Sequence, residues 1–194
     1  MKRRTAIRAL LNVALMALLS ASYSADAIDV EQVAFEPSAD GEAWLLSSDF
    51  SLTLSPALED AVNRGVPLYF LVEFELRRSR WYWWDDRAAV ATQTHRLSYF
   101  ALTRQYRVLL NGVPGSFSTL SEALEAMSHL RGWRVMPRER VRPGTSYEGW
   151  LRLRLDTDQL PKPFQITALT SRDWNPQSEW KRFNIKPEPL KSAQ

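Results

Sequence analysis

Cysteine is absent from the chain of 194 residues. The protein therefore has no disulfide framework, no thiolate metal ligand and no cysteine nucleophile. Because a bacterial lipoprotein is modified on an N-terminal cysteine, we also expect no lipid anchor. Histidine is scarce: His95 and His129 are the only two, and their spacing matches no metal-binding motif. The sequence therefore predicts no metal site and no cofactor.

The apolar stretch near the N-terminus is too short to favour a membrane-spanning helix. Ala9 to Ala21 is mostly apolar but covers 13 residues, whereas a bilayer needs about 20. It leads to Ala25-Asp26-Ala27, the small-x-small pattern of a signal peptidase site. Four basic residues precede it: Lys2, Arg3, Arg4 and Arg8. These features predict a signal peptide over 1–27 and a periplasmic or secreted protein, with an uncleaved inner-membrane anchor as the minority alternative.

The net charge of +3 is located mainly in this segment. Cleavage after Ala27 would remove four of the 25 basic and one of the 22 acidic side chains, leaving 21 of each in 28–194. A neutral domain lacks the positive field that attracts polyanions. We therefore expect no nucleic-acid partner.

A run of arginines is the one local charge bias in the remaining sequence. Its members are Arg131, Arg134, Arg138, Arg140, Arg142, Arg152 and Arg154. Such a surface can meet lipid headgroups or an acidic partner, and we expect peripheral contact with an anionic surface through Arg138, Arg140 and Arg142. The alternative is that nearby carboxylates neutralise the arginines. The candidates for that pairing are Glu122, Glu125, Glu139, Glu148 and Asp156.

Alternation of apolar and polar residues with period two predicts a mainly β fold. We expect strands over 28–37, 44–54, 67–76 (a central strand), 87–110 (one or two strands), 147–155, 164–169 and 180–185. About seven strands separated by turn signals favour a single-domain β-sandwich, immunoglobulin-like in general architecture, over a closed barrel. The sandwich is expected to span 28–186, after the signal peptide, with 187–194 as a C-terminal tail.

One or two short helices accompany the strands. The segment 56–63 has Ser55 in position to cap it, Pro56 at its first position and Gly65 just past its end. The segment 118–130 has an apolar stripe, Ser118 or Ser121 as the expected cap and Gly132 as the expected stop.

The densest chemical signal is a cluster of aromatic and charged residues: Arg80, Trp81, Tyr82, Trp83, Trp84, Asp85 and Asp86. Exposed flat rings beside carboxylates and a guanidinium group suit a protein interface or sugar recognition. We take this cluster as the candidate binding site. The alternative is that the rings cap one end of the sandwich with arginines stacked on them.

Other candidate sites carry weaker signals. Glu73 and Glu75 share one side of a strand at roughly 7 Å, a spacing that glycoside hydrolysis can use. The alternative is salt bridges across the sheet to arginines such as Arg104 or Arg107. We expect His95 on a strand surface and His129 at a helix C-terminus, where the helix dipole stabilises it. No recognisable catalytic motif is present, so we expect no enzymatic activity.

Three clusters together resemble a known family: Arg78 to Asp85, Leu155 to Pro163, and Asp173 to Trp180. With the signal peptide and the helix at 56–63, they are similar to the exported proteobacterial family named domain of unknown function 4390. The resemblance extends over nearly all of the mature chain. It implies an envelope location, a single domain and, at most, a link to envelope signalling, and it supplies no catalytic residues.

The sequence thus predicts an exported, non-enzymatic binding protein of the bacterial cell envelope, with another envelope protein as partner. The alternative is a carbohydrate-directed protein, either a glycan-binding module or a weak glycosidase that uses Glu73 and Glu75.

Overall fold

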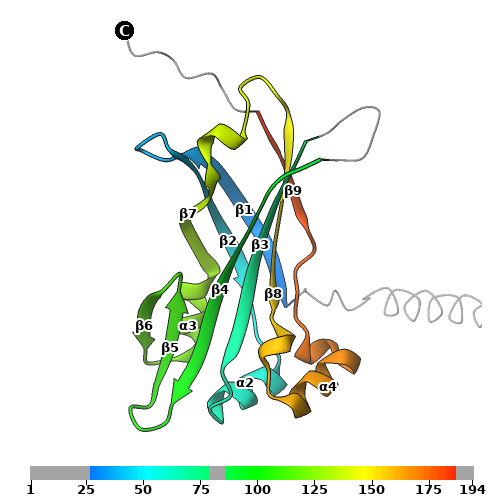
Figure 1. Cartoon of the computed structure of the whole chain (residues 1–194). Helices are drawn as coiled ribbons and strands as arrows, with labels where there is room; N and C mark the ends of the chain where they lie inside the picture. Colours follow the sequence, from blue (N-terminus) through cyan, green and yellow to red (C-terminus); the bar gives the residue numbers. More distant parts are fainter. Residues whose placement is uncertain (1–26, 79–85, 187–194) are drawn as a thin grey trace, which may run out of the picture.

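The computed structural model describes residues 27–78 and 86–186, which form two antiparallel sheets (Figure 1). One sheet has three strands in the order β1-β2-β7, and the other has six in the order β6-β5-β4-β3-β8-β9. The strands are β1 (Ile28–Pro37), β2 (Ala43–Leu52), β3 (Leu68–Arg78), β4 (Asp86–Phe100), β5 (Gln105–Leu110), β6 (Val113–Phe117), β7 (His129–Pro137), β8 (Tyr147–Leu155) and β9 (Lys181–Ile185). The expectation of a mainly β protein is confirmed, whereas the immunoglobulin-like arrangement stays a prediction.

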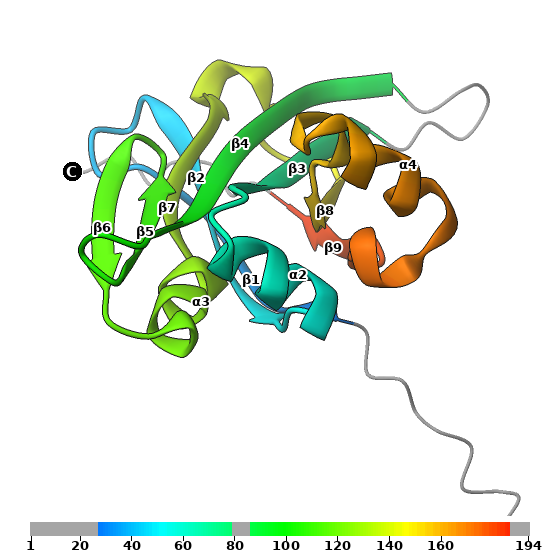
Figure 2. The same cartoon turned by 90° about the horizontal axis from the view of Figure 1, so that it is seen from below.

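Three α-helices and three short 3-10 helices connect the described strands. The α-helices are α2 (Pro56–Asn63), α3 (Leu120–Ser128) and α4 (Lys162–Thr170). The 3-10 helices are η1 (Arg138–Arg140), η2 (Thr157–Gln159) and η3 (Arg172–Trp174). Figures 1 and 2 show α2 and α4 at the same end of the molecule, and the paired ends of β3 and β4 at the opposite end.

The two sheets share one hydrophobic core, and β3 is its centre, as the sequence predicts. Every second residue of β3, from Leu68 to Leu76, is 0% exposed. The ring of Phe74 faces Phe35 of β1 across the core, with 6.0 Å between ring centroids. Burying each such side chain stabilises the fold by roughly 1.5–3 kcal/mol. The core therefore holds the sheets face to face in a sandwich-like arrangement.

The three-stranded sheet is too narrow to cover the six-stranded one. β1 packs against β8 and β9, and β7 packs against β4. This leaves the inner face of β5 and β6 without a facing strand. α3 covers one part of that face, since it contacts both β5 and β6, and it lies beside this hairpin in Figure 2.

Local sequence signals place α2 correctly. Ser55 accepts a hydrogen bond from the backbone of Leu58 at 3.3 Å, Pro56 is the first helical residue, and Gly65 follows the end with φ of +89°. Leu58 and Val62 lie on one face and are 0% exposed. The predicted cap, start and stop of this helix are all confirmed.

The predicted boundaries of α3 are wrong at both ends. Thr119, and neither Ser118 nor Ser121, caps the helix, in a capping box with Glu122. The helix ends at Ser128 and not at Gly132, because the chain from His129 onward pairs with β2. Strand pairing and burial of the apolar residues of β7 outweigh the local helical pattern.

The segment 164–169, predicted as a strand, lies in the helix α4. Pro163 fits the first turn of a helix, where its missing N–H is not needed. The Gln165 side chain donates hydrogen bonds to the backbone carbonyls of Asp158 and Leu160, at 2.7 and 2.8 Å, and so ties the helix to η2. The alternation of apolar residues in this segment is therefore not a strand signal. The described chain has three α-helices where one or two short helices were expected.

We expect Thr119→Ala to lower the free energy of unfolding by about 1 kcal/mol, because the substitution removes the side chain that caps α3. Urea denaturation followed by circular dichroism measures the loss. Ser121→Ala is the matched control, since this exposed residue does not cap the helix. It should change stability by no more than about 0.5 kcal/mol. Equal losses in the two variants would contradict the capping assignment.

Candidate functional site

The predicted binding cluster lies outside the described residues. Arg80, Trp81, Tyr82, Trp83, Trp84, Asp85 and the side chain of Asp86 belong to this part of the chain. The cluster connects the paired ends of β3 and β4, where Arg78 is opposite Asp86. Its role as a binding site therefore stays a prediction.

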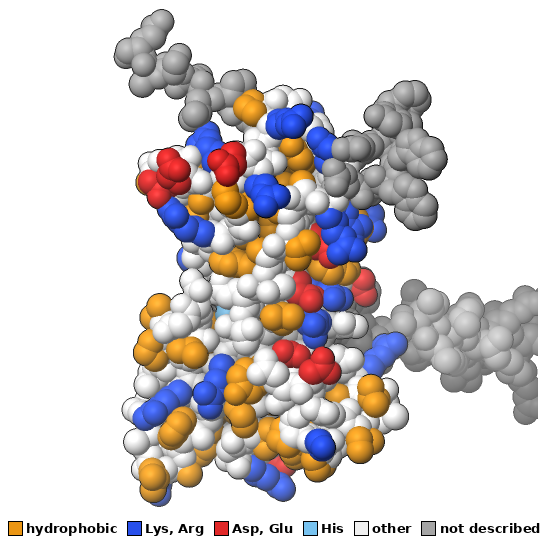
Figure 3. All heavy atoms as spheres, in the orientation of Figure 1, with side chains coloured by type: hydrophobic (Ala, Val, Ile, Leu, Met, Phe, Trp, Pro, Cys, Tyr) orange, Lys and Arg blue, Asp and Glu red, His pale blue; other side chains and the backbone are white. Residues whose placement is uncertain are grey.

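The arginine run is largely neutralised, but by partners other than those expected. Arg131 pairs with Asp49, Arg134 pairs with Asp40, and Arg152 and Arg154 both pair with Glu73. The expected carboxylates have other contacts, such as that of Glu148 with the indole N–H of Trp150 at 2.9 Å. Arg138 lies over the ring of Trp44, 5.6 Å from its centroid. Basic and acidic side chains are accordingly interspersed on the face seen in Figure 3.

The two carboxylates, Glu73 and Glu75, are each bound by arginine side chains. Glu73 accepts hydrogen bonds from Arg152 and from Arg154, the latter at 3.2 Å. Burial raises the pKa of Glu73, but the two arginines outweigh it and lower the pKa below its ordinary value. Glu75 accepts two hydrogen bonds from Arg77, at 3.0 and 2.8 Å. A glycosidase acid must keep its proton near neutral pH, so this geometry does not suit the role.

The salt bridges of Glu73 run across the sheet as expected, but not to Arg104 or Arg107. β3 pairs with β8 on one side and with β4 on the other, so a side chain of β3 meets residues of those two strands. Arg107 lies on β5, which is two strands away.

A cleft lies where the inner face of β4, β5 and β6 extends past β7. Its volume is about 340 Å³, within the range of small-ligand pockets. The β5–β6 hairpin forms one wall and β7 forms the other. The walls are mostly apolar, with Val108, Leu110, Val113 and Phe117 on the hairpin side and Leu130 and Trp133 on β7.

Two polar side chains of β4 lie at the floor of this cleft. His95 is 1% exposed and Gln93 is 8% exposed. Both lie on the face of the sheet that the core uses, because His95 is opposite Phe70 and Gln93 is opposite Val72. The expectation that His95 lies on a strand surface is therefore wrong. The polar residues occupy inward positions at which a strand of this kind usually carries apolar side chains.

The hydrogen bond between these two side chains determines which ring nitrogen of His95 carries the proton. The Gln93 amide nitrogen lies 3.0 Å from Nε2 of His95. Burial lowers the pKa of His95 to about 4, so the ring is neutral near pH 7. Because an amide nitrogen can only donate, Nε2 accepts and the ring proton is on Nδ1. Nδ1 of His95 and Oε1 of Gln93 are buried, and neither has a hydrogen-bond partner in the described part of the chain.

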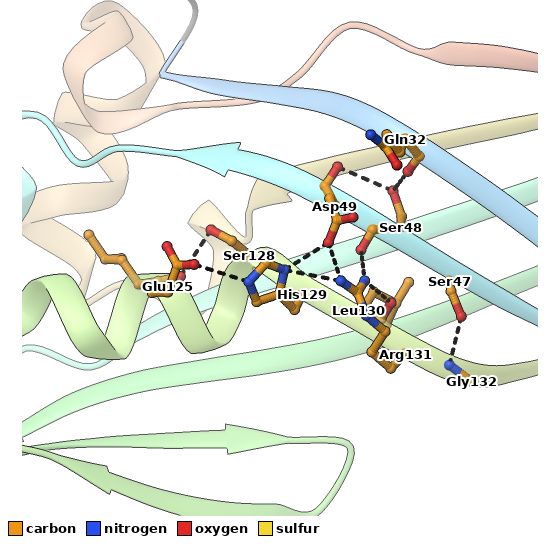
Figure 4. Close-up of polar contacts among 11 residues, drawn as sticks. Gln32, Ser47, Ser48, Asp49, Glu125, Ser128, His129, Leu130, Arg131 and Gly132 are labelled. Atoms are coloured by element: carbon orange, nitrogen blue, oxygen red, sulfur yellow. Dashed lines mark hydrogen bonds and ion pairs between the residues drawn. The ribbon is translucent and has the colours of Figure 1, made fainter.

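A network of charged residues fixes the rim of the cleft where α3 passes into β7 (Figure 4). His129 contacts Asp49 of β2 through Nδ1 at 2.7 Å and Glu125 of α3 through Nε2 at 3.1 Å. Hydrogen bonds to the two carboxylates raise the pKa of His129. Arg131 pairs with Asp49 and donates to the carbonyl of Ser48 at 3.0 Å. His129 does end a helix, as expected, but specific carboxylates stabilise its charge.

The pattern that marks the cleft is visible in the sequence, although it was not among the predicted sites. Gln93 and His95 are two residues apart, which places both side chains on one face of a strand, and Leu97 continues that face. Strand pairing then decides whether the face is buried. The walls come from 108–117 and 129–133, and only the folded chain brings these segments together with β4.

Comparison with known proteins identifies one family. A sequence profile of the family described as Domain of unknown function (DUF4390) matches residues 25–184, which include the whole cleft. This match confirms the family resemblance. No curated protein and no solved structure matches the chain.

The two histidines predict opposite effects of pH on stability. The pKa of His95 is about 4 in the folded chain, against roughly 6.5 in an unfolded one. Between these values the unfolded chain binds the extra proton, so stability falls with falling pH, by about 2 kcal/mol at pH 5. The pKa of His129 is raised, so its stabilising contribution is present below about pH 6.5 and is lost as the pH rises through its folded-state value.

Urea denaturation near pH 7 and pH 5 measures these effects. We expect His95→Leu to remove about 2 kcal/mol of the destabilisation that acid causes, because leucine has no proton to bind. His129→Gln should instead enlarge the loss on acidification, since it removes the contribution that increases as the pH falls. If His95→Leu lost as much stability on acidification as the unsubstituted protein, the assignment of a neutral, buried His95 would be wrong.

Proposed function

The chain belongs to the DUF4390 family, and we propose that it is a non-enzymatic binding protein exported to the bacterial cell envelope. We propose that it recognises another envelope protein through the cleft between β7 and the β5–β6 hairpin. The family resemblance suggests a link to envelope signalling.

The observation that carries this proposal is the composition of the cleft. Binding pockets are concave and mostly apolar, with a few polar groups that fix the orientation of the ligand. This cleft has apolar walls, and at its floor a donor on His95 and an acceptor on Gln93 that other described residues leave unpaired. An unpaired buried polar group costs roughly 1–3 kcal/mol. A ligand that supplies both partners would recover that cost.

The residues of the cleft favour binding over chemistry. Its lining, as far as the structure describes it, contains no Ser, Thr, Cys, Lys, Asp or Glu side chain. His95 has no acidic partner to orient it as a base, and no nucleophile lies beside it among those lining residues. The absence of enzymatic activity remains part of the proposal.

The position of the predicted signal peptide supports export as part of this proposal. The predicted signal peptide ends at Ala27, and the first strand begins at Ile28, so cleavage after Ala27 would leave every described strand and helix in place. Within 27–78 and 86–186, no helix is long and apolar enough to cross a membrane.

A carbohydrate-directed function has less support. The clearest aromatic pair on the outer face of the described sheet is Trp150 and Trp180, whose centroids are 6.3 Å apart. Arg77 and Arg182 lie over Trp150 at 4.3 and 3.9 Å, and Arg152 lies over Trp180 at 4.4 Å. Guanidinium groups thus occupy ring faces on which a sugar would stack. The glycan alternative then depends on Trp81 to Trp84, outside the described residues.

We retain two further surfaces in the proposal. The cluster from Arg80 to Asp86 is a second candidate contact with the partner. Peripheral contact with an anionic surface through Arg138, Arg140 and Arg142 also remains a proposal, since Arg138 and Arg140 belong to η1 and Arg142 follows shortly after it.

Site-specific photo-crosslinking in cells tests the location of the binding surface. The amino acid p-benzoylphenylalanine replaces Val113, which lines the cleft and is 68% exposed. We expect an adduct with one defined envelope protein from this position. Val90 is the matched control, a strand valine of 55% exposure that is opposite Glu75 and so shares the outer face of the sheet. It should give no such adduct.

A third position separates the two candidate surfaces. The same replacement at Trp83 reports on the cluster from Arg80 to Asp86. Adducts from Trp83 with none from Val113 would move the binding site away from the cleft. Equal adducts from Val113 and Val90 would refute a specific site at the cleft.

A further inference from the structure

We propose that the occupant of the cleft is an extended polypeptide segment that pairs with the free edge of β7 and inserts an Asn or Gln side chain toward Gln93 and His95. This inference rests on the proposed function and names the chemical class of its ligand. Three observations carry it: the edge of β7, the shape of the hollow beside it, and the two polar groups at its floor.

β7 is an edge strand of the three-stranded sheet. Its inner neighbour is β2, and no described strand pairs with its other side. An unpaired edge presents a row of backbone N–H and C=O groups that another strand can bind. Adding a strand to such an edge is a general mode of peptide recognition, in which the backbone provides affinity and alternate side chains provide specificity.

The cleft is lined by residues of β7 from His129 to Trp133. A second hollow, lined by residues that include Asp40, Gly132 and Arg134, shares Asn111 and Trp133 with the cleft. The two together extend from His129 to Arg134. At about 3.3 Å per residue, six residues of an extended chain would cover roughly 20 Å, so a short peptide fits along this edge.

The floor determines which side chain enters. A strand added to β7 directs its backbone toward β7 and alternate side chains toward the six-stranded sheet. The two floor residues carry one buried donor, Nδ1–H of His95, and one buried acceptor, Oε1 of Gln93, and neither has a partner in the described part of the chain. A carboxamide carries one carbonyl acceptor and an amide donor, so it matches both groups at once. A carboxylate would place an anion beside the acceptor of Gln93, and an aliphatic side chain would leave both groups unpaired.

The apolar walls specify the neighbours of that side chain. In an extended peptide, the residues two before and two after the carboxamide point the same way. They would meet Leu110 and Val113 on the hairpin side and Leu130 and Trp133 on β7, so aliphatic residues suit these positions. The expected pattern is aliphatic-x-(Asn or Gln)-x-aliphatic.

Titration of the full chain with defined peptides tests this inference. The first probe is the blocked peptide acetyl-Val-Thr-Gln-Thr-Val-amide, and binding is measured by isothermal titration calorimetry. The second probe carries Leu in place of Gln, and the third is N-methylated on the amides that would pair with β7. We expect the first probe to bind, and each of the others to bind at least about tenfold more weakly. The Leu peptide leaves the buried groups of Gln93 and His95 unpaired, and the N-methylated peptide cannot donate to the backbone of β7.

A matched protein variant separates recognition from a general loss of structure. The double variant Gln93→Leu with His95→Leu replaces both polar groups with apolar ones of similar size, so it should fold. We expect it to reverse the preference and bind the Leu peptide at least about tenfold more tightly than the Gln peptide. An unchanged preference in this variant would show that Gln93 and His95 do not read the side chain.

Several other outcomes would overturn the inference, and some of them would identify a different occupant. These are equal binding of the Gln and Leu peptides, binding of none of the peptides, binding of dodecanoate or N,N′-diacetylchitobiose in their place, or a dimer of this chain through β7 in sedimentation equilibrium. The crosslink from Val113 is an independent readout. If it forms while the peptides fail, the proposed function stands and only the peptide inference falls.

Discussion

The unequal width of the two sheets is the constraint on which the rest of the structure depends. Six strands need their inner face covered, and three strands cover only part of it. The core is centred on β3, where both sheets are present, and every inward side chain from Leu68 to Leu76 is fully buried. α3 covers part of β5 and β6, and the remaining inner face becomes the cleft. The cleft thus results from the way the smaller sheet covers only part of the larger one.

The polar residues of β4, Gln93 and His95, lie where the smaller sheet no longer covers the larger one. Stability alone would favour apolar side chains at Gln93 and His95, because their unpaired groups each cost roughly 1–3 kcal/mol. Natural proteins keep such costs mostly at functional sites. The charged network of His129, Asp49 and Arg131 fixes β7 to β2 and to α3 beside the same cleft. A rigid wall and an unsatisfied floor together are the features of a preformed site.

Sequence patterns correctly predicted the helices and strands whose signals lie close together in the chain. They failed where pairing with a distant segment determines the conformation. α2 has its cap, its proline and its glycine within ten residues, and β3 has unbroken alternation, so both were predicted correctly. The strand β7 was missed because Gly132 was taken as a helix stop, whereas pairing with β2 decides its conformation. The cleft could not be predicted, since its floor and walls come from residues up to 40 positions apart in the chain. Its one local signal is the spacing of Gln93 and His95.

Several charged and aromatic side chains on the outer face of the large sheet contact one another, which favours other parts of the molecule for recognition. Glu73 binds two arginines, and the rings of Trp150 and Trp180 are covered by others. Two of the remaining candidates, the cleft and the cluster from Arg80 to Asp86, are connected by β4. From Asp86 to Gln93 the strand advances by roughly 23 Å, at about 3.3 Å per residue. That separation is too long for one small ligand but within the footprint of a protein, so joint use of both surfaces implies a macromolecular partner.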